Sequence, residues 1–491
     1  MRRMAEYLLG LDQGSTNSKA VLIDRKGRIV RESVVPLKTD RPRPGWVEHD
    51  PKAILTSQLI AINQVIKSFN KSKTLISGLG IANQRSTLVL WDKNTGKPIT
   101  PAISWQDLRA AELTRKWADH HELIRSKTGL ILTPYYAAPK LRWLLDRIKG
   151  IRTKAEQGKI LCGTVNTYLI WHLTKGEVHA TDHTNAARML LMNLHSLSWD
   201  EELLSLFDIP PAILPRILPT SADYGTARLS GMEIPIRASI GDQQAGLLGL
   251  GAVSPGEAAV NYGTGGFLLV NTGSQPIFIP GLLSNLAWTT PDETAHVVEG
   301  TVNAVGTVFE WFERMGLIKS PGEIDRIASS ARGTVYLVPA LAGLGAPHWL
   351  SEARMSIFGL GPETSTADLV RAAVEGIAFL IKDIAEVIER DGRIRIKTLT
   401  AGGGGSRIQS LVQTQADLLG LPILRSDVTE ATALGAALLA GVGCGWWKSP
   451  SAAPKIQTGK IFRPRMSETD REERYGQWKK AIEAVRSFSG G

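Results

Sequence analysis

The chain has 491 residues, 43% hydrophobic and 21% charged, a globular balance that excludes a low-complexity protein and favours two domains. Its net charge of +10 is spread along the chain without a dense basic block, which argues against nucleic acid and suits an anionic substrate such as a nucleotide. No apolar run reaches about 18 residues, so we expect no membrane span. The two cysteines, Cys162 and Cys444, lie far apart in the chain, which argues against a disulfide framework and against a zinc site. This cysteine usage favours a cytoplasmic location.

Apolar runs and turn residues predict alternating strands and helices in the first half. Three strands lie within residues 6–35, the first two joined by the turn in "GLDQGSTNSK", residues 10–19. Helical spacing of apolar residues follows over 52–69. Further strands are predicted at 75–83, 86–92 and 236–242, and further helices at 107–119, 140–148 and 164–174.

The second half opens like the first. "EAAVNYGTGGFLLVNTG", residues 257–273, is again strand, Gly-Thr turn and strand. This plan predicts an internal duplication into two related α/β domains that face one another. Because the stretch 216–236 is rich in Pro, Ser and Gly, we place the boundary near residue 250 and expect domains at 1–250 and 251–491.

The first hairpin tip carries the groups that hold a phosphate. Gly14 allows close approach of the backbone, and Ser15, Thr16 and Lys19 offer donors and charge. Asp12 could hold Mg²⁺ against phosphate oxygens. The alternative is a tight hairpin in which Asp12 and Gly14 serve only the turn.

Two more glycine loops follow in the second half. Thr264, in "NYGTGG", would form the opposite jaw of a phosphate clamp. The run Gly402–Gly405 lies between a strand predicted at 394–400 and a helix predicted at 408–420, which is a common nucleotide-binding arrangement. It matches neither the P-loop nor GxGxxG, and a flexible turn is the alternative.

Asp242 stands between the strand 236–242 and a following helix, in "SIGDQQAGLLG". It is either a helix N-cap or a general base that takes a proton from an acceptor hydroxyl. Arg85 and Gln84 lie near a strand end, and Trp105 follows in "SWQD". Donors beside an aromatic wall suit a small polyhydroxylated ligand, whereas core packing for Trp105 and a surface ion pair for Arg85 are the alternatives.

The motifs "GLDQGST", "PGWVEHDP", "NQRST", "GDQQAGLLG", "NYGTGGF", "GLGAPHW", "AGGGGSR" and "TALGAALLAG" occur in an order that resembles the FGGY carbohydrate kinases over about residues 6 to 485. The resemblance is greatest to members that phosphorylate glycerol. It implies an α/β fold of two duplicated actin-like, ribonuclease-H-like domains with ATP and Mg²⁺ in the cleft between them. For the assembly, it allows either a homodimer or a homotetramer.

The resemblance also implies roles for individual residues. Asp242 would be the catalytic base and, with Asp12, would face the metal. The acceptor would bind Arg85, Ser86, Trp105, Tyr135, Asp242, Gln243 and Phe267. The nucleotide would bind Gly14, Ser15, Thr16, Lys19, Gly263, Thr264, Gly306, Gly403, Gly404 and Arg407.

Several positions depart from the family pattern. Ser86 stands where glycerol-phosphorylating members carry an acidic residue, which opens space for a longer polyol or a ketose. Lys19 replaces an arginine, Ala401 an aspartate and Arg407 an asparagine. The glycine-rich regulatory loop of some members is not matched at 226–236, so we predict no sugar-phosphate feedback there.

The sequence therefore predicts an ATP-dependent kinase of a primary hydroxyl, with glycerol as the leading acceptor and erythritol, ribitol, xylulose or ribulose as alternatives. Transfer would be direct and in line. An ATPase without an acceptor and a non-catalytic actin-like ATP-binding sugar sensor are the competing classes, and the presence of Asp242 argues against the sensor.

Overall fold

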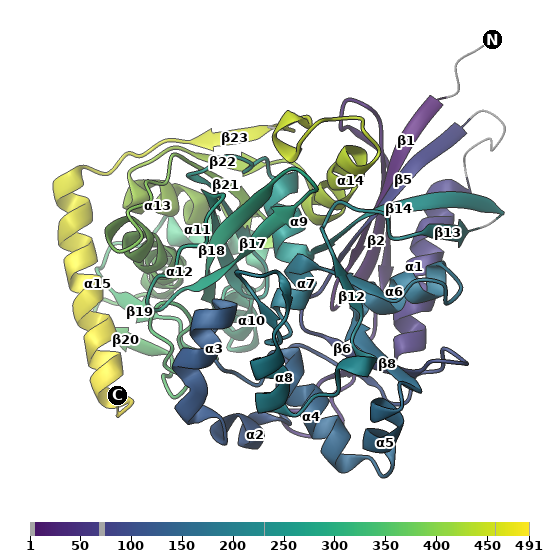
Figure 1. Ribbon diagram of the computed structural model, residues 1–491. Coiled ribbons are helices and arrows are strands. Elements are labelled where there is room, and N and C mark those ends of the chain that lie inside the picture. Colours follow the sequence, from purple (N-terminus) through teal and green to yellow (C-terminus); the bar gives the residue numbers. More distant parts are fainter. Residues whose placement is uncertain (1–4, 68–73, 230, 457, 491) are drawn as a thin grey trace.

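The computed structural model describes residues 5–67, 74–229, 231–456 and 458–490, which form two lobes (Figure 1). Each lobe is built on one large β-sheet. The first sheet has the order β13-β14-β5-β1-β2-β3, with bounds Thr226–Leu229, Met232–Gly241, Thr74–Asn83, Ala5–Gln13, Asn17–Ile23 and Ile29–Pro36. The second has the order β17-β18-β16-β15-β21-β22-β23, with bounds Leu283–Thr289, Thr294–Val302, Gly266–Gly273, Glu257–Tyr262, Thr398–Gly402, Ile423–Ser426 and Gly459–Phe462.

The two sheets repeat one topology, with one extra edge strand, β17, in the second. In each, three antiparallel strands run into two parallel ones and end on an antiparallel edge strand. β3-β2-β1 corresponds to β18-β16-β15, β5-β14 to β21-β22, and β13 to β23. The duplication predicted from the sequence is confirmed, and the fold is the expected pair of actin-like α/β units.

Helices cover both faces of the first sheet and extend the first lobe downward in Figure 1. α1 begins where the sequence provides Asp50 as N-cap, which accepts from the Lys52 amide, and Pro51 as first residue. The first-lobe helices are α1 Pro51–Ile66, α2 Ala111–Arg115, α3 His121–Thr128, α4 Ala137–Arg147, α5 Ile151–Glu156, α6 Val165–Leu173, α7 His183–Ala187, α8 Glu201–Phe207 and α9 Asp242–Gly249. Short strands there are β4 Glu48–His49, β6 Leu88–Asp92, β7 Ala102–Ile103, β8 Ile160–Thr164, β9 Ala180–Asp182, β10 Met192–Asn193, β11 Ser198–Trp199 and β12 Arg216–Leu218.

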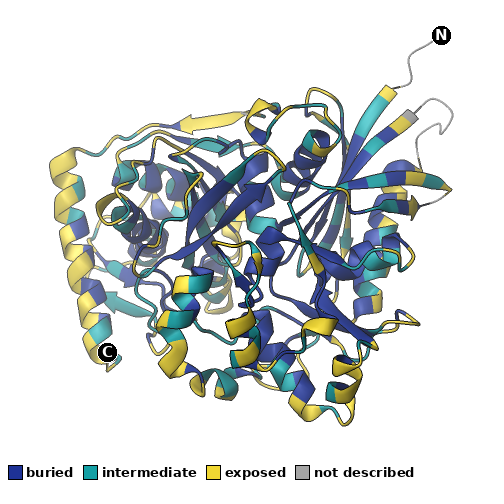
Figure 2. Ribbon diagram, viewed as in Figure 1, coloured by how far each residue is buried: buried dark blue, intermediate teal, exposed yellow. Residues whose placement is uncertain are grey.

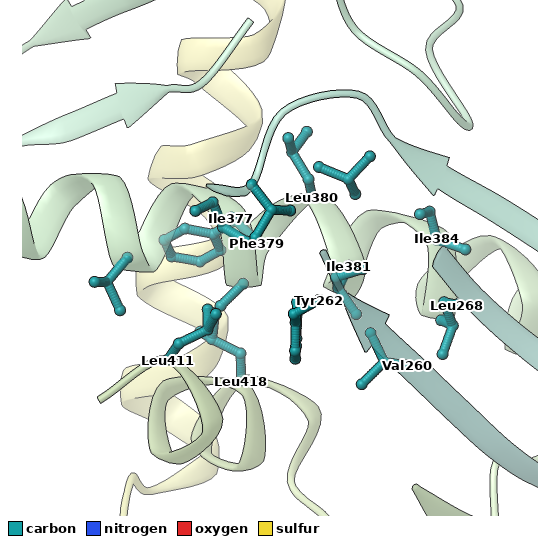
Figure 3. Packing of buried hydrophobic residues seen from close by; sticks show 14 of the residues in the cluster. Val260, Tyr262, Leu268, Ile377, Phe379, Leu380, Ile381, Ile384, Leu411 and Leu418 are labelled. Carbon is teal, nitrogen blue, oxygen red and sulfur yellow. The ribbon is translucent and has the colours of Figure 1, made fainter. Parts of the chain in front are cut away.

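The second lobe has its own core around the 25-residue α12, which starts at a capping box between Ser365 and Asp368. Figure 3 shows this core, where side chains of α12 and α13 meet Val260, Tyr262 and Leu268 of β15 and β16. The helices are α10 Gly306–Arg314, α11 Ile324–Ala328, α12 Thr366–Arg390, α13 Gln409–Leu419, α14 Ala431–Gly443 and α15 Glu468–Phe488, beside strands β19 Tyr336–Val338 and β20 Ser356–Phe358.

Helices α9 and α14 form the seam between the lobes. α14 follows the second sheet in the chain but lies on β1 and β5 of the first. The two helices cross where only glycine fits: a Cβ at Gly249 would lie 1.9 Å from the Ala431 carbonyl oxygen, and one at Gly435 would lie 1.9 Å from that of Ala245. In Figure 2 the central strands of both sheets and this seam are buried, whereas the edge strand β23 and the outer side of α15 are exposed.

Among the described helices, α12 included, none has both the length and the apolarity to cross a membrane. Both cysteines are free thiols, Cys162 buried and Cys444 partly buried.

Several predicted elements have different bounds. The helix predicted at 107–119 is only α2 and a turn of 3₁₀-helix at Ala118–His120. The Asp107 carboxylate accepts a hydrogen bond from the distant Val47 amide, which holds the residues before α2 in a turn. The strand predicted at 394–400 begins only at Thr398, where its neighbour β15 also begins, and Arg393 has a φ of +54°. These two predictions were wrong in extent.

Other predictions hold within a few residues. The helix predicted at 52–69 is α1. The last two positions of the predicted range, 68 and 69, lie outside the described part of the chain. The strand predicted at 86–92 begins at Leu88, because Ser86 has a φ of +63° and Thr87 donates back to Gln84. The stretch 216–236 contains β12, β13 and the start of β14, so the strand predicted to begin at 236 already begins at Met232.

Candidate active site

A cavity of about 540 Å³ lies between the lobes. It is lined by the β1–β2 hairpin and α9 from the first lobe, and by β15, β16, the 402–407 loop and the segment 425–432 from the second. Nine residues singled out from the sequence line it: Asp12, Gly14, Lys19, Asp242, Gln243, Phe267, Gly403, Gly404 and Arg407. The structure thus brings motifs from both halves to one space.

Asp12 lies at the cavity end of β1 with only 7% of its surface exposed. Burial raises the pKa of its carboxyl to about 7, an effect that nearby Lys19 opposes and Asp242 reinforces. Lys19 reaches Asp12 only at 4.0 Å and makes its short contact, 2.7 Å, with Glu430 across the cavity. Asp12 is therefore a carboxylate with too little positive charge around it.

Asp242 is the first residue of α9, and Gly241 is the N-cap, so the N-cap alternative for Asp242 is wrong. The Thr184 hydroxyl accepts from the Gly241 amide at 2.8 Å and fixes the start of the helix. The Asp242 carboxylate faces the cavity and lies 3.3 Å from Nε of Arg85. Burial raises its pKa, which Arg85 partly offsets.

Arg85 is buried, which excludes the surface ion pair. Its Nη1 and Nη2 donate to both oxygens of Glu299 at 2.7 and 3.0 Å, and Arg188 donates to the same carboxylate at 2.7 Å. Glu299 belongs to β18 of the second lobe and is wholly buried. The two arginines lower its pKa to about 2, so it is charged at neutral pH.

Trp105 and Tyr135 stand edge to face beside this cluster, with ring centroids 6.5 Å apart. Trp105 is half-buried, so it is not a core residue, and its indole N–H donates to Ser15 Oγ at 3.0 Å. The Ser15 hydroxyl in turn donates to Gln84, whose amide also donates to the Gly14 carbonyl. Ser15 thus ties the phosphate hairpin to the predicted aromatic wall.

Ser86 is buried and adopts a left-handed backbone conformation that non-glycine residues rarely take. Its hydroxyl donates to the Arg188 carbonyl at 3.2 Å. Nη1 of Arg188 is buried and, within the described parts of the chain, has no hydrogen-bond partner. An acidic side chain at position 86 would lie beside the main chain of Arg188, whose guanidinium already binds Glu299 through Nη2.

The remaining predicted nucleotide residues lie outside the cavity lining. Thr16 is exposed at the first hairpin tip. Gly263 and Thr264 are exposed at the second, and their carbonyls accept from the amides of Gly306 and Val305. Gly403, by contrast, lines the cavity. Its φ is +81°, and a Cβ there would lie 2.4 Å from Asn261 Oδ1, so only glycine fits.

Sequence reasoning missed Glu299, Arg188, Gln244 and Glu430. Glu299 carried a signal, since a lone carboxylate in the apolar run of β18 must find a cation when buried. Its partners lie 214 and 111 residues away in the chain, and no local pattern identifies them. Glu430 precedes α14, and only the fold brings it to Lys19.

No group of three or more His, Cys, Asp or Glu side chains forms a ready metal site within the described ranges. Asp12 and Asp242 nevertheless fit a magnesium ion, because Mg²⁺ in phosphoryl-transfer sites takes one or two carboxylates and completes its shell with water and phosphate. Bound there, it would supply the positive charge that Asp12 lacks.

Comparison with known proteins decides the family. The model of the N-terminal domain of the FGGY family of carbohydrate kinases matches residues 7–249, and that of the C-terminal domain matches residues 258–444. The chain belongs to the FGGY family of carbohydrate kinases. It is therefore an ATP-dependent phosphotransferase with an alcohol group as acceptor.

Individual FGGY relatives agree over the whole chain. A glycerol kinase of Thermus brockianus is 44% identical, with 98% of this chain and 99% of the relative covered. The structure of Plasmodium falciparum glycerol kinase with ADP matches with a TM-score of 0.92 and 34% identity over 98% of both chains. A ligand-bound xylulose kinase of Lactobacillus acidophilus, at 24% identity, TM-score 0.88 and 99% coverage of both chains, shares the fold.

Proposed function

We propose that this FGGY kinase transfers the γ-phosphoryl group of ATP to a primary hydroxyl of glycerol, giving glycerol 3-phosphate and ADP. The observation that carries the proposal is the Asp242 carboxylate, which faces a cavity between the two lobes and is held 3.3 Å from the buried Arg85. The glycerol kinases among its relatives, at 34% to 44% identity over almost the whole chain, support glycerol as the acceptor.

Asp242 acts as the general base. Burial raises its pKa, which makes it a better proton acceptor than an ordinary aspartate, and the Arg85 contact opposes that rise. As the acceptor oxygen bonds to the γ-phosphorus, the bond from that phosphorus to the β–γ bridging oxygen breaks. The hydroxyl proton passes to Asp242, and ADP leaves with the bridging oxygen.

Arg85, Gln243 and Tyr135 orient the hydroxyls of the acceptor, and Trp105 and Phe267 face its carbon chain. Gly14, Lys19, Gly403, Gly404 and Arg407 hold the nucleotide from both sides of the cavity. Ser15, Thr16, Gly263, Thr264 and Gly306 lie outside its lining, and we propose that they meet the phosphates when the lobes close over ATP.

Mg²⁺ is the metal that we propose for this site, held by Asp12 with Asp242 nearby. When bound, it neutralises charge on the phosphate oxygens. The functional halves that we propose are residues 1–250, with the acceptor site and first phosphate loop, and residues 251–491, with most of the nucleotide site.

Ser86 is neutral at the position where the resemblance to the family implies a carboxylate for the acceptor hydroxyls, so longer polyols and ketoses are tested beside glycerol. A coupled assay of ADP release should compare glycerol, erythritol, ribitol, xylulose and ribulose with no acceptor. We expect glycerol to raise the rate at least a hundredfold. Equal rates with and without acceptors would point to an ATPase, binding without turnover to a sensor, and a higher kcat/KM for another polyol or ketose would replace glycerol.

A further inference from the structure

Glu299 is an acidic residue of the second lobe that binds two arginines of the first. Its carboxylate takes three short hydrogen bonds, 2.7 and 3.0 Å from Arg85 and 2.7 Å from Arg188. None of the Glu299 side chain is exposed, and those of Arg85 and Arg188 are 6% and 7% exposed. Charge-assisted, buried contacts of this kind fix orientation strongly.

The contacts use up the donors of Arg85 in a defined way. A guanidinium has five N–H groups in a rigid fork. Nε meets Asp242, Nη1 donates to Glu299 and at 3.3 Å to Gln244, and Nη2 donates to Glu299. One N–H on Nη2 is left by these contacts. Because Glu299 accepts hydrogen bonds from both Nη1 and Nη2, the guanidinium plane is fixed and the remaining N–H points in one direction.

The charges of the cluster balance. Arg85 and Arg188 carry two positive charges, and Glu299 and Asp242 two negative ones. Without the charge of Glu299, Asp242, which lies 3.3 Å from Nε of Arg85, would be the carboxylate that remains in contact with Arg85. Arg85 would then pair more closely with the base and lose the direction that the acceptor needs.

We infer that Glu299 is an interlobe positioning residue, which holds Arg85 in place for the acceptor hydroxyl. This inference rests on the proposed function. It adds to the acceptor site a residue of the second lobe that touches neither substrate, so assembly of that site depends on the contact between lobes. Neighbouring contacts at the same edge support that dependence, since Thr220 and Thr289 exchange hydrogen bonds between the lobes.

The matched control is Glu375. It is a buried glutamate of the second lobe that also binds two arginines, Arg474 at 2.6 Å and Arg371 at 3.6 Å, but lies in α12 away from the cavity. The same substitution there removes a buried charge without touching Arg85. Any general effect of losing such a charge appears in both variants.

The experiment compares Glu299→Gln and Glu375→Gln with the wild type for acceptor KM, kcat and ADP affinity. For Glu299→Gln we expect the acceptor KM to rise roughly ten- to a hundredfold with ADP affinity nearly unchanged. For Glu375→Gln we expect acceptor KM and ADP affinity both to stay near those of the wild type.

An unchanged acceptor KM in folded Glu299→Gln, or an equal change in Glu375→Gln, would overturn the inference. If Glu299→Gln does not fold, Glu299→Asp keeps the charge but shortens the reach, and we then expect a smaller rise in acceptor KM at unchanged ADP affinity. An unchanged KM in that variant would also overturn it. A wild type that turns over no acceptor would instead refute the proposed function, and the positioning role with it.

Discussion

Asp242 and Arg85 show how one contact sets a reactive group at the residue scale. Burial raises the pKa of Asp242, and Arg85, 3.3 Å away, opposes that rise. The result is a carboxylate beside the cavity whose pKa is still raised above that of an ordinary aspartate.

Asp242→Asn tests the base directly. Asparagine keeps the shape but accepts no proton, so kcat should fall about 10²- to 10⁴-fold while nucleotide affinity stays near normal. Steady-state kinetics and titration with ADP measure the two quantities. A variant that retained a tenth of wild-type turnover would show that another group is the base.

Ser86→Glu tests why the acceptor pocket differs from the family pattern. A carboxylate there would begin beside the Arg188 carbonyl, and we expect it to restore an acceptor for glycerol hydroxyls. We expect kcat/KM for glycerol to rise about tenfold, the value of one hydrogen bond to a charged group. Ser86→Ala is the control, and an unchanged or lower kcat/KM in Ser86→Glu would reject this explanation.

Asp12→Asn separates stability from function. The pKa of Asp12 is raised from 3.8 to about 7, so the folded state binds a proton more tightly than the unfolded chain. Stability is therefore lost as pH rises from about 4 to 7, by up to roughly 4 kcal/mol. At pH 8 and without ligands, the asparagine variant should be about 1–2 kcal/mol more stable to urea than the wild type. The gain is smaller than about 4 kcal/mol because Lys19 loses a charged partner. The variant should also be inactive.

That gain should shrink below pH 7, where wild-type Asp12 is protonated. An Asp12→Asn protein that is less stable than the wild type at pH 8, or whose advantage does not depend on pH, would show that Asp12 is not a poorly compensated charge.

At the scale of elements, the crossing of α9 and α14 is the tightest contact between the lobes. Gly249→Ala places a methyl group where the Ala431 carbonyl lies, 1.9 Å away, so the helices must separate. We expect a loss of at least about 3 kcal/mol in urea unfolding. Gly246→Ala, one turn earlier, meets nothing nearer than Thr432 Oγ1 at 3.6 Å and should be neutral or stabilising. Equal losses in both variants would contradict this account of the seam.

Local patterns predicted the elements whose cause is local. β1, β2 and α1 follow from alternation, helical spacing and turn residues, and the two glycine hairpins identified the duplication. The break of the helix predicted at 107–119 depends on the contact of Asp107 with Val47, 60 residues earlier. The partner of Arg85 lies 214 residues away, in the other lobe. Sequence patterns identify such groups singly but not their pairing.

On the scale of the whole molecule, we propose that the two lobes divide the work of one reaction. The first lobe contributes Asp12, Arg85 and Asp242, and the second contributes Gly403, Arg407 and the Glu299 carboxylate. The cavity exists only between them, so acceptor and nucleotide can meet only where both lobes contribute. Binding of nucleotide should accordingly stabilise the whole chain, by about 2.7 kcal/mol at a hundredfold excess over Kd.

The most direct measurement is the fate of the γ-phosphoryl group, followed by phosphorus NMR while the enzyme turns over ATP with Mg²⁺ and glycerol present. We predict one phosphomonoester, glycerol 3-phosphate, formed in equal amount to ADP. Inorganic phosphate in place of that ester, at a rate that glycerol does not change, would contradict the account.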